Sequence, residues 1–344
     1  MTVAVTGAAG HLGNNLVRAL CADGAAVRCL ILPTDDPRPL ADLPVETVIG
    51  DVRDPHCLRA AFAGAELVYH LASVIAIRPG SERLMQEVNV EGARRVAAAC
   101  RAAGVGRLVH VSSIHALREP PGQEPFDERQ PFDPPAIGMA YGRSKAQGTL
   151  AVLEAVEQGL DAVVACPTGL VGPHDYGPSE MGRLILDYAA GRLRACVEGA
   201  YDFVDVRDVA DGLRRLARRG RTGQHYIMGG ERISVDDILG HLCRLVGERP
   251  RPVKVPAGVA TIAADAASLY CRLTRRRPRL TRDVLATLRS NCNISSAKAR
   301  TELGYRARPL AASFADTVAW FRDQGLIRSP GRPRGEPGSA RRRG

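Results

Sequence analysis

Tyr141 and Lys145 are the residues whose types and spacing most directly suggest chemistry. They lie four positions apart, at the start of a helical pattern that continues through Leu150 and Leu153. Residues at this spacing share one face of a helix, so both side chains can reach one ligand. A nearby ammonium group favours the phenolate, and a fall of roughly two to three units in the pKa of Tyr141 would allow acid–base catalysis at neutral pH. Taken alone, the same spacing is also typical of a surface pair.

Two serines offer hydroxyl groups upstream of this pair. Ser112 and Ser113 end a strand predicted over residues 107–112. In parallel sheets the carboxyl ends of the strands form the edge at which ligands bind, although serine is common at strand ends. A proline-rich loop, predicted over 118–137, joins the serines to Tyr141, and long loops inside compact domains are often functional.

A glycine-rich turn near the start of the chain has the spacing of a phosphate-binding turn. An apolar run breaks at Gly7, and a helical pattern begins at Leu12. Gly7 permits a tight turn, Gly10 lets the backbone approach a pyrophosphate, and Gly13 lets the helix lie close to the strand. The free N–H groups at the helix start then face an anion. The alternative is a glycine-rich turn that binds no ligand. The position of this turn directly after the first strand favours binding of a dinucleotide.

Strands and helices alternate through the first half of the chain. The predicted strands are the run before Gly7 and residues 25–32, 46–49, 67–70 and 107–112, and a long helix is predicted over 81–103. This alternation predicts an α/β fold with a doubly wound parallel sheet of the Rossmann type.

The second half is less regular. Helices are predicted over 181–190, 206–219, 235–246 and 310–321, and strands over 203–206 and 225–228. Ser234 is predicted to cap the helix over 235–246. We expect residues 1–173 to form mainly the dinucleotide-binding core. Residues 174–328 should form mainly a smaller substrate lobe, from which a strand near 203–228 returns to the core. The tail 329–344, rich in Pro, Gly and Arg, is expected to be disordered.

Polar residues at other strand ends are candidate cofactor contacts. Asp51 follows the third strand and can accept from the adenine amino group, whereas Asp54 before Pro55 is predicted to cap a helix. His70 is interpreted as a packed strand-end residue. The second strand runs into Ile31-Leu32-Pro33-Thr34, which lacks the usual discriminator between NAD and NADP and leaves that choice open.

Composition excludes several classes of protein. The chain has 344 residues, a formal net charge of +10 and 45% hydrophobic residues. No nucleic-acid-binding motif accompanies the charge, and its nine cysteines contain no C-x-x-C pair, so neither nucleic acid nor a metal site is expected. Without a predicted leader or membrane span, a cytoplasmic protein is expected. The amphipathic stretch 259–273 is interpreted as a lobe helix, with contact to a membrane surface as the alternative.

Together these motifs resemble the extended short-chain dehydrogenases/reductases of the NAD-dependent epimerase/dehydratase superfamily, over about residues 2–325. The matching elements are the turn TGAAGHLG, Asp51, His70-Leu71-Ala72, Asn89-Val90-Glu91-Gly92, Ser112-Ser113 and YGRSK. The segments 166–173 and 203–210 resemble the dihydroflavonol reductase and 3β-hydroxysteroid dehydrogenase branch.

The resemblance implies Tyr141 as general acid/base, Lys145 as the group that lowers its pKa and holds the nicotinamide ribose, and Ser113 as a donor to the substrate oxygen. Asn89 would act through structure or a bound water. The implied cofactor contacts are Gly7, Gly10, His11, Leu12, Gly13, Asp51, Val52, Leu71, Ala72, Asn89, Ser112, Tyr141, Lys145 and Pro167. Near the substrate it places Tyr176, Tyr201 and Phe203, each of which also fits a core position.

The implied function is an NAD(P)-dependent oxidoreductase acting on a carbonyl or secondary alcohol of an apolar small molecule, with NAD or NADP as cofactor. A sugar-nucleotide epimerase or dehydratase with tightly held NAD is one alternative. It is weakened because Cys166 and Val171 stand where such enzymes usually have Arg and Tyr. A non-catalytic dinucleotide sensor is another, and the oligomeric state, including a homodimer, stays open.

Overall fold

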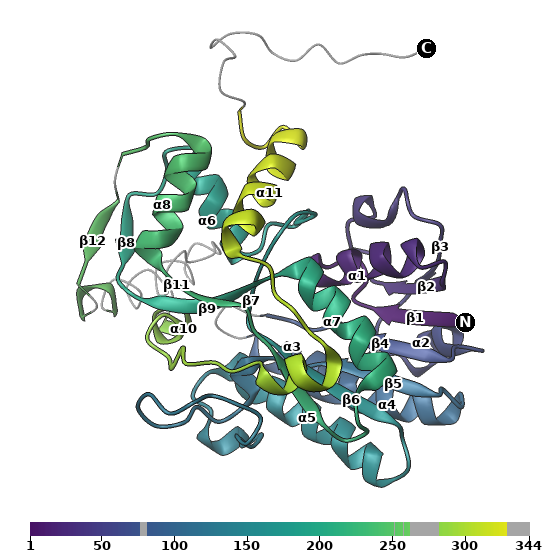
Figure 1. Ribbon diagram of the computed structural model, residues 1–344. Helices are drawn as coiled ribbons and strands as arrows, with labels where there is room; N and C mark the ends of the chain where they lie inside the picture. Colours follow the sequence, from purple (N-terminus) through teal and green to yellow (C-terminus); the bar gives the residue numbers. More distant parts are fainter. Residues whose placement is uncertain (76–80, 251, 257, 262–281, 329–344) are drawn as a thin grey trace, which may run out of the picture.

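A seven-stranded parallel sheet forms the centre of the molecule. The computed structural model describes the chain except for residues 76–80, 251, 257, 262–281 and 329–344 (Figure 1). The strand order is β10-β6-β5-β4-β1-β2-β3, and every neighbouring pair is parallel. The strands are β1 (Thr2–Thr6), β2 (Ala26–Ile31), β3 (Val45–Ile49), β4 (Leu67–His70), β5 (Arg107–Val111), β6 (Ala162–Pro167) and β10 (His225–Met228). The order reverses between β1 and β4, so the predicted doubly wound fold is confirmed.

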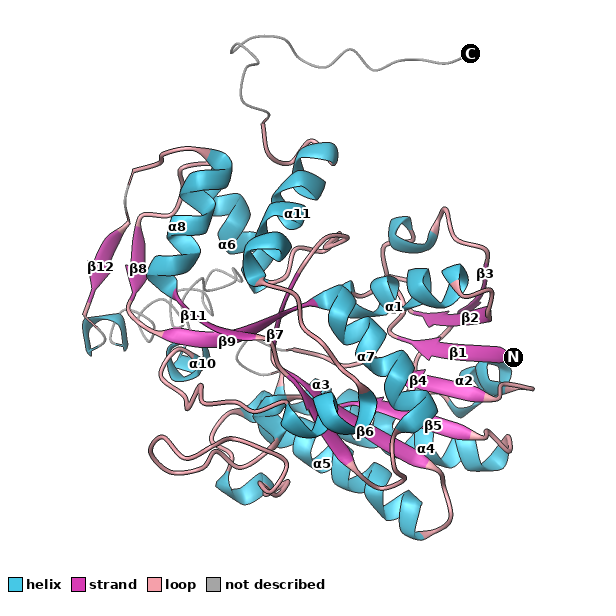
Figure 2. Cartoon of the chain, viewed as in Figure 1, coloured by secondary structure: helices cyan, strands magenta, loops and turns pink. Residues whose placement is uncertain are grey.

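Helices cover both faces of this sheet (Figure 2). On one face α1 (His11–Ala22) and α7 (Val206–Arg219) contribute Leu16, Val17, Leu213 and Leu216 to one apolar cluster. On the other face α2 (Pro55–Phe62), α4 (Ala93–Ala102) and α5 (Ala140–Glu157) contribute Phe62, Val96 and Val152 to another. Because both faces are covered, the central strands are apolar throughout rather than alternating.

The long helix predicted over 81–103 is present, but its middle is a π-helical segment. It consists of α3 (Glu82–Met85), the π segment η2 (Gln86–Gly92) and α4. A Cβ at Gly92 would lie 3.0 Å from Val52 Cγ2, which gives a packing reason for glycine inside a helix. Wider turns of this kind are frequent at functional sites, and Asn89 lies in this one.

The second half builds a smaller layer beside the sheet. It contains a three-stranded sheet of β7 (Gly169–Val171), β9 (Ala200–Asp205) and β11 (Glu231–Ser234), and a pair of β8 (Ala195–Val197) and β12 (Val253–Val255). The helices α6 (Glu180–Ala189), α8 (Val235–Val246) and α11 (Leu310–Asp323) share an apolar cluster that includes Trp320. The short α10 (Arg282–Thr287) follows the undescribed segment.

Both predicted helix caps are confirmed, and two other predicted features lie outside the described residues. Asp54 caps α2 by accepting from the His56 N–H, and Ser234 caps α8 by accepting from the Asp237 N–H. In the described part of the chain, eight cysteines are free thiols, and no helix is long and apolar enough to cross a membrane. Residues 262–273 of the predicted amphipathic helix and the tail 329–344 lie outside the described residues.

Candidate active site

The glycine turn between β1 and α1 fits a pyrophosphate. Gly7 has a φ of +69°, and a Cβ there would lie 2.7 Å from the Ala72 nitrogen. A Cβ at Gly13 would lie 2.1 Å from the Gly7 carbonyl oxygen, whereas at Gly10 its only neighbour within 4 Å is that same oxygen, at 3.3 Å. Gly10 is the N-cap of α1, without a side-chain cap and with no acidic residue in the first turn. The Gly10 N–H donates to the Gly7 carbonyl (3.1 Å), and the N–H groups of the first turn of α1 that follow it are available to an anion.

A loop from the second half of the chain is tied to this turn. The Nδ2 of Asn15 donates to the Pro173 carbonyl (3.2 Å), and the Nδ2 of Asn14 donates to the His174 carbonyl (3.0 Å). His11 Nε2 lies 3.1 Å from the Pro173 carbonyl oxygen. The side chain of His11 therefore fixes this loop, which leaves its backbone N–H for the cofactor.

Two glycines set the position of α5, which carries Tyr141 and Lys145. A Cβ at Gly142 would lie 2.3 Å from the His115 carbonyl oxygen, and a Cβ at Gly148 would lie 2.0 Å from the Asn89 carbonyl oxygen. The helix therefore packs backbone against backbone on both neighbouring segments, which fixes its depth and rotation.

Asn89 links α5 to the end of β4. Its Oδ1 accepts from the Val74 N–H (2.8 Å), and its Nδ2 donates to the Val74 carbonyl (3.0 Å) and to Ser144 Oγ (2.9 Å). Ser144 Oγ donates in turn to the Tyr141 carbonyl (2.8 Å). Of the two roles implied by the resemblance, these contacts supply the structural one.

We expect Gly148→Ala to lower the free energy of unfolding by about 3 kcal/mol, because α5 must move away from Asn89 to admit the methyl group. Gly240→Ala is the matched control, since Gly240 also lies inside a helix but its Cβ would meet only Arg244 Nη1, at 3.7 Å. There the better helix propensity of Ala should add about 0.5–1 kcal/mol. Urea denaturation measures both, and a Gly148→Ala protein as stable as wild type would contradict this close packing.

The Tyr141 hydroxyl faces two serines. Burial raises the pKa of Tyr141 to about 12, while hydrogen bonds with the Ser113 and Ser73 side chains act to lower it. Ser113 Oγ accepts from the His115 N–H (3.2 Å), which leaves the Ser113 proton free to donate. The structure therefore brings Ser113 and Tyr141 together, as the sequence predicts.

Lys145 lies one helical turn further, but it does not act on Tyr141 as expected. Its side chain is buried, and Nζ donates to the Val111 carbonyl (2.7 Å). Burial lowers the pKa of Lys145 to about 8. The predicted fall in the pKa of Tyr141 is therefore wrong for the protein without cofactor, because desolvation dominates and the ammonium is held by a backbone carbonyl.

Two buried histidines lie behind Lys145. Thr6 Oγ1 and His70 Nδ1 are 2.8 Å apart, and the rings of His70 and His110 are 5.3 Å apart. Burial lowers the pKa of His70 to about 3 and that of His110 well below its usual value, and the Lys145 charge adds to both shifts. The interpretation of His70 as a packed strand-end residue is consistent with this neutral, hydrogen-bonded state.

The remaining implied cofactor residues lie along the carboxyl edge of the sheet. Ser112 Oγ is 2.7 Å from Thr149 Oγ1, so its hydroxyl faces α5. Asp51 is held by the guanidinium of Arg53, with contacts of 2.8 and 3.1 Å. Pro167 is the last residue of β6, which lies between β10 and β5 in the sheet.

The three residues expected near the substrate separate into two groups. Tyr201 and Phe203 lie on β9 with ring centroids 5.6 Å apart, and the charge of Tyr141 contributes to the raised pKa of Tyr201. Tyr176 lies elsewhere: its hydroxyl accepts from Arg18 Nη2 (3.3 Å) and its ring packs edge-on against Trp320. The Tyr176 side chain lies between α1 and α11, and its placement near the substrate stays a prediction.

His115 is the residue at this site that the sequence did not single out. Its Nε2 lies 2.9 Å from the Tyr201 hydroxyl, and the two rings stack with centroids 5.6 Å apart. Tyr201 is 86 positions away in the sequence, so only the fold reveals the pair. The position of His115 directly after the serine motif was the one available signal.

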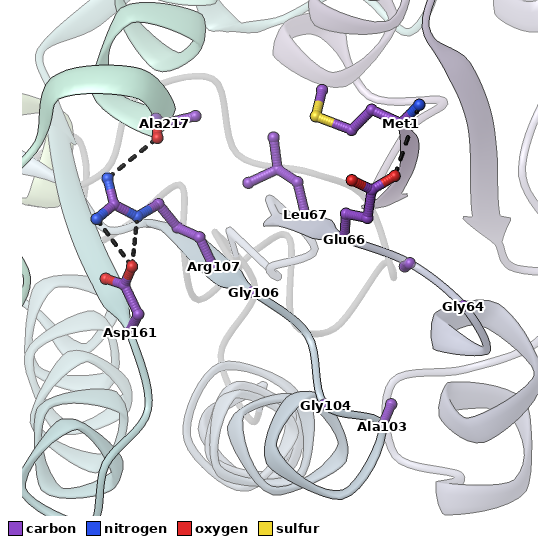
Figure 3. Close-up of a pocket in the computed structure, with 11 residues that line it drawn as sticks. Met1, Gly64, Glu66, Leu67, Ala103, Gly104, Gly106, Arg107, Asp161 and Ala217 are labelled. Atoms are coloured by element: carbon purple, nitrogen blue, oxygen red, sulfur yellow. Dashed lines mark hydrogen bonds and ion pairs between the residues drawn. The ribbon is translucent and has the colours of Figure 1, made fainter.

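A surface pocket of about 590 Å³ lies at the opposite, amino edge of the sheet (Figure 3). It is lined by Met1, Glu66, Leu67 and Arg107, among others. Arg107 is engaged by Asp161 (2.8 Å) and by the carbonyls of Ala217 and Gly220. The guanidinium of Arg107 therefore links the start of β5 to the segment just before β6 and to the end of α7.

Comparisons with known proteins agree with this geometry. Residues 3–229 match the model of the NAD dependent epimerase/dehydratase family. The chain is 40% identical to sterol demethylase protein B of Methylococcus capsulatus, over 95% of this chain and 100% of that protein. It is 30% identical to a candidate dihydroflavonol 4-reductase of Synechocystis (94% and 96% covered).

Two further relatives extend the comparison. A 4-hydroxy-2-methyl-3-oxo-4-farnesyl-3,4-dihydroquinoline-1-oxide ketoreductase of Stigmatella aurantiaca is 30% identical, with 90% of this chain and 92% of that protein covered. The crystal structure of gox2253 superimposes with a TM-score of 0.83 at 34% identity, covering 95% of this chain and 99% of that one.

Proposed function

Since the chain belongs to the NAD-dependent epimerase/dehydratase family, we propose that it reduces a carbonyl, or oxidises a secondary alcohol, of an apolar small molecule with NAD or NADP. The observation that carries this proposal is the contact of Ser113 with Tyr141, one helical turn from a buried lysine. Two hydroxyl donors then converge where a carbonyl oxygen would sit, which is the arrangement that reduction requires.

Each residue has a separate role in the proposed reaction. The nicotinamide of the bound cofactor supplies or accepts the hydride. In reduction, Ser113 donates a hydrogen bond to the substrate oxygen and Tyr141 transfers its proton to that oxygen, so the carbonyl becomes an alcohol. Lys145 would provide a buried ammonium that donates to the hydroxyls of the cofactor ribose.

Apolar surroundings support an apolar substrate. Phe203 and Tyr201 border the Tyr141 group, and Cys166, a buried thiol, stands where a sugar diphosphate would want a fixed guanidinium. The names of the relatives, which include a sterol demethylase protein and a farnesyl-quinoline ketoreductase, point in the same direction.

The end of β2 favours NAD over NADP. The Asp35 carboxylate accepts from the Leu32 N–H (2.9 Å), and the Asp36 carboxylate binds Arg38 through Nε and Nη2 (2.9 and 2.6 Å). A 2′-phosphate would meet two carboxylates there, and the guanidinium of Arg38 is already engaged by Asp36. Carboxylates repel phosphate and accept hydrogen bonds from ribose hydroxyls.

The test is to measure binding of NADH and NADPH by fluorescence and then to follow oxidation of the preferred one with a panel of apolar ketones. We expect tighter binding of NADH, many turnovers per enzyme, and no NAD retained through purification. Stoichiometric NAD in the purified protein, together with no net oxidation of added NADH, would contradict the proposal and favour an epimerase or dehydratase.

A further inference from the structure

His115 and Tyr201 form a polar pair that joins the two halves of the chain beside Tyr141. His115 lies in the short 3-10 helix η3 (Ile114–Ala116), directly after Ser113, and Tyr201 lies on β9. The distance from His115 Nε2 to the Tyr201 hydroxyl is 2.9 Å, and the ring planes differ by only 8°. Both rings therefore have fixed positions before any ligand arrives.

This pair borders the proposed reaction centre. The backbone N–H of His115 donates to Ser113 Oγ (3.2 Å), and its carbonyl oxygen lies against Gly142, the neighbour of Tyr141. Burial raises the pKa of Tyr201 well above its usual value, and among the nearby charges that add to the shift is Tyr141. A group bound by the pair would thus be close to an oxygen held by Ser113 and Tyr141.

The pair has one hydrogen-bond donor more than it uses. Burial lowers the pKa of His115 to about 4, so at neutral pH the ring carries one N–H and Tyr201 carries one O–H. If the tyrosine donates to Nε2, the His115 Nδ1–H is left over. If Nε2–H donates to the tyrosine, its O–H is left over. Within the described residues His115 Nδ1 has no hydrogen-bond partner, and the side chain is partly exposed.

Resting on the function proposed above, we propose that His115, supported by Tyr201, binds a second oxygen of the substrate, a hydroxyl or carbonyl on the carbon next to the reacting one. A neutral oxygen fits better than a carboxylate, because Asp202 and Glu119 are among the groups whose charges already raise the pKa of Tyr201. The Stigmatella ketoreductase is named for a 4-hydroxy-3-oxo compound, in which the two oxygens stand on neighbouring carbons.

The experiment compares two probe ketones that differ only in this oxygen, 1-tetralone and 2-hydroxy-1-tetralone. His115→Phe keeps a planar ring and removes both nitrogens, whereas His115→Gln keeps an N–H donor. We expect His115→Phe to lower kcat/KM about 10-fold or more for the hydroxyketone and by less than about threefold for the plain ketone. His115→Gln should recover part of the loss.

The outcomes separate this inference from the function on which it rests. Equal losses for both ketones would show that His115 only positions Ser113, and no loss for either would show that it contacts no substrate; each result overturns the inference alone. A wild-type protein that oxidises NADH with neither ketone overturns the proposed function and this inference together. Matching thermal unfolding of the variants excludes misfolding as the cause of a selective loss.

Discussion

Tyr141→Phe is expected to lower turnover by roughly 10²–10⁴-fold, the usual contribution of general acid–base catalysis, while NADH binding stays within about threefold of wild type. The substitution removes one hydroxyl and keeps the ring. The hydrogen bonds from Asn89 to Ser144 and from Ser144 to the Tyr141 carbonyl do not involve the Tyr141 hydroxyl. The fold of α5 should therefore persist.

Rate assays of ketone reduction measure the effect on turnover, and fluorescence titration with NADH measures the effect on cofactor binding. Ser112→Ala is the matched control, because Ser112 Oγ faces Thr149 rather than Tyr141; its turnover should fall far less. If Tyr141→Phe reduces ketones at the wild-type rate, another group provides the proton and the proposed mechanism is wrong.

The parts that sequence predicts well are those with strong local signals. The glycine turn, the Asp54 and Ser234 caps and the span of α7 follow from residues within a few positions of one another. The pairing of β10 with β6 in the main sheet also agrees with the expectation that a strand in the second half returns to the core.

The parts that sequence does not predict depend on distant contacts. The contacts of Tyr176 with Arg18 and Trp320 join residues far apart in the sequence, so no local pattern predicts them. The partner of His115 lies on a strand of the second half. The spacing of four residues predicts that Tyr141 and Lys145 share one face of a helix. It cannot show that the Val111 carbonyl accepts from the Lys145 ammonium.

Lys145→Met is expected to lower turnover by roughly 10²-fold or more and, in the protein without cofactor, to change how stability depends on pH. Burial lowers the pKa of Lys145 from 10.5 to about 8 in the folded state. Between these values the unfolded chain binds more protons than the folded one, so the wild-type protein gains stability as pH rises. Below pH 8 Lys145 is protonated in both the folded and the unfolded protein, so the full cost of burying the ammonium is present.

Methionine cannot titrate, so the variant lacks this gain. The difference in unfolding free energy, variant minus wild type, should fall by about 2 kcal/mol between pH 7 and pH 10. The lost hydrogen bond to Val111 and any change in packing contribute equally at both values and cancel. Urea denaturation across this range provides the measurement, and Lys254→Met is the control because Lys254 is exposed and its pKa is raised by Asp236. A flat difference for Lys145→Met would mean that the ammonium is solvated in the folded protein, and the buried charge proposed to hold the cofactor ribose would be absent.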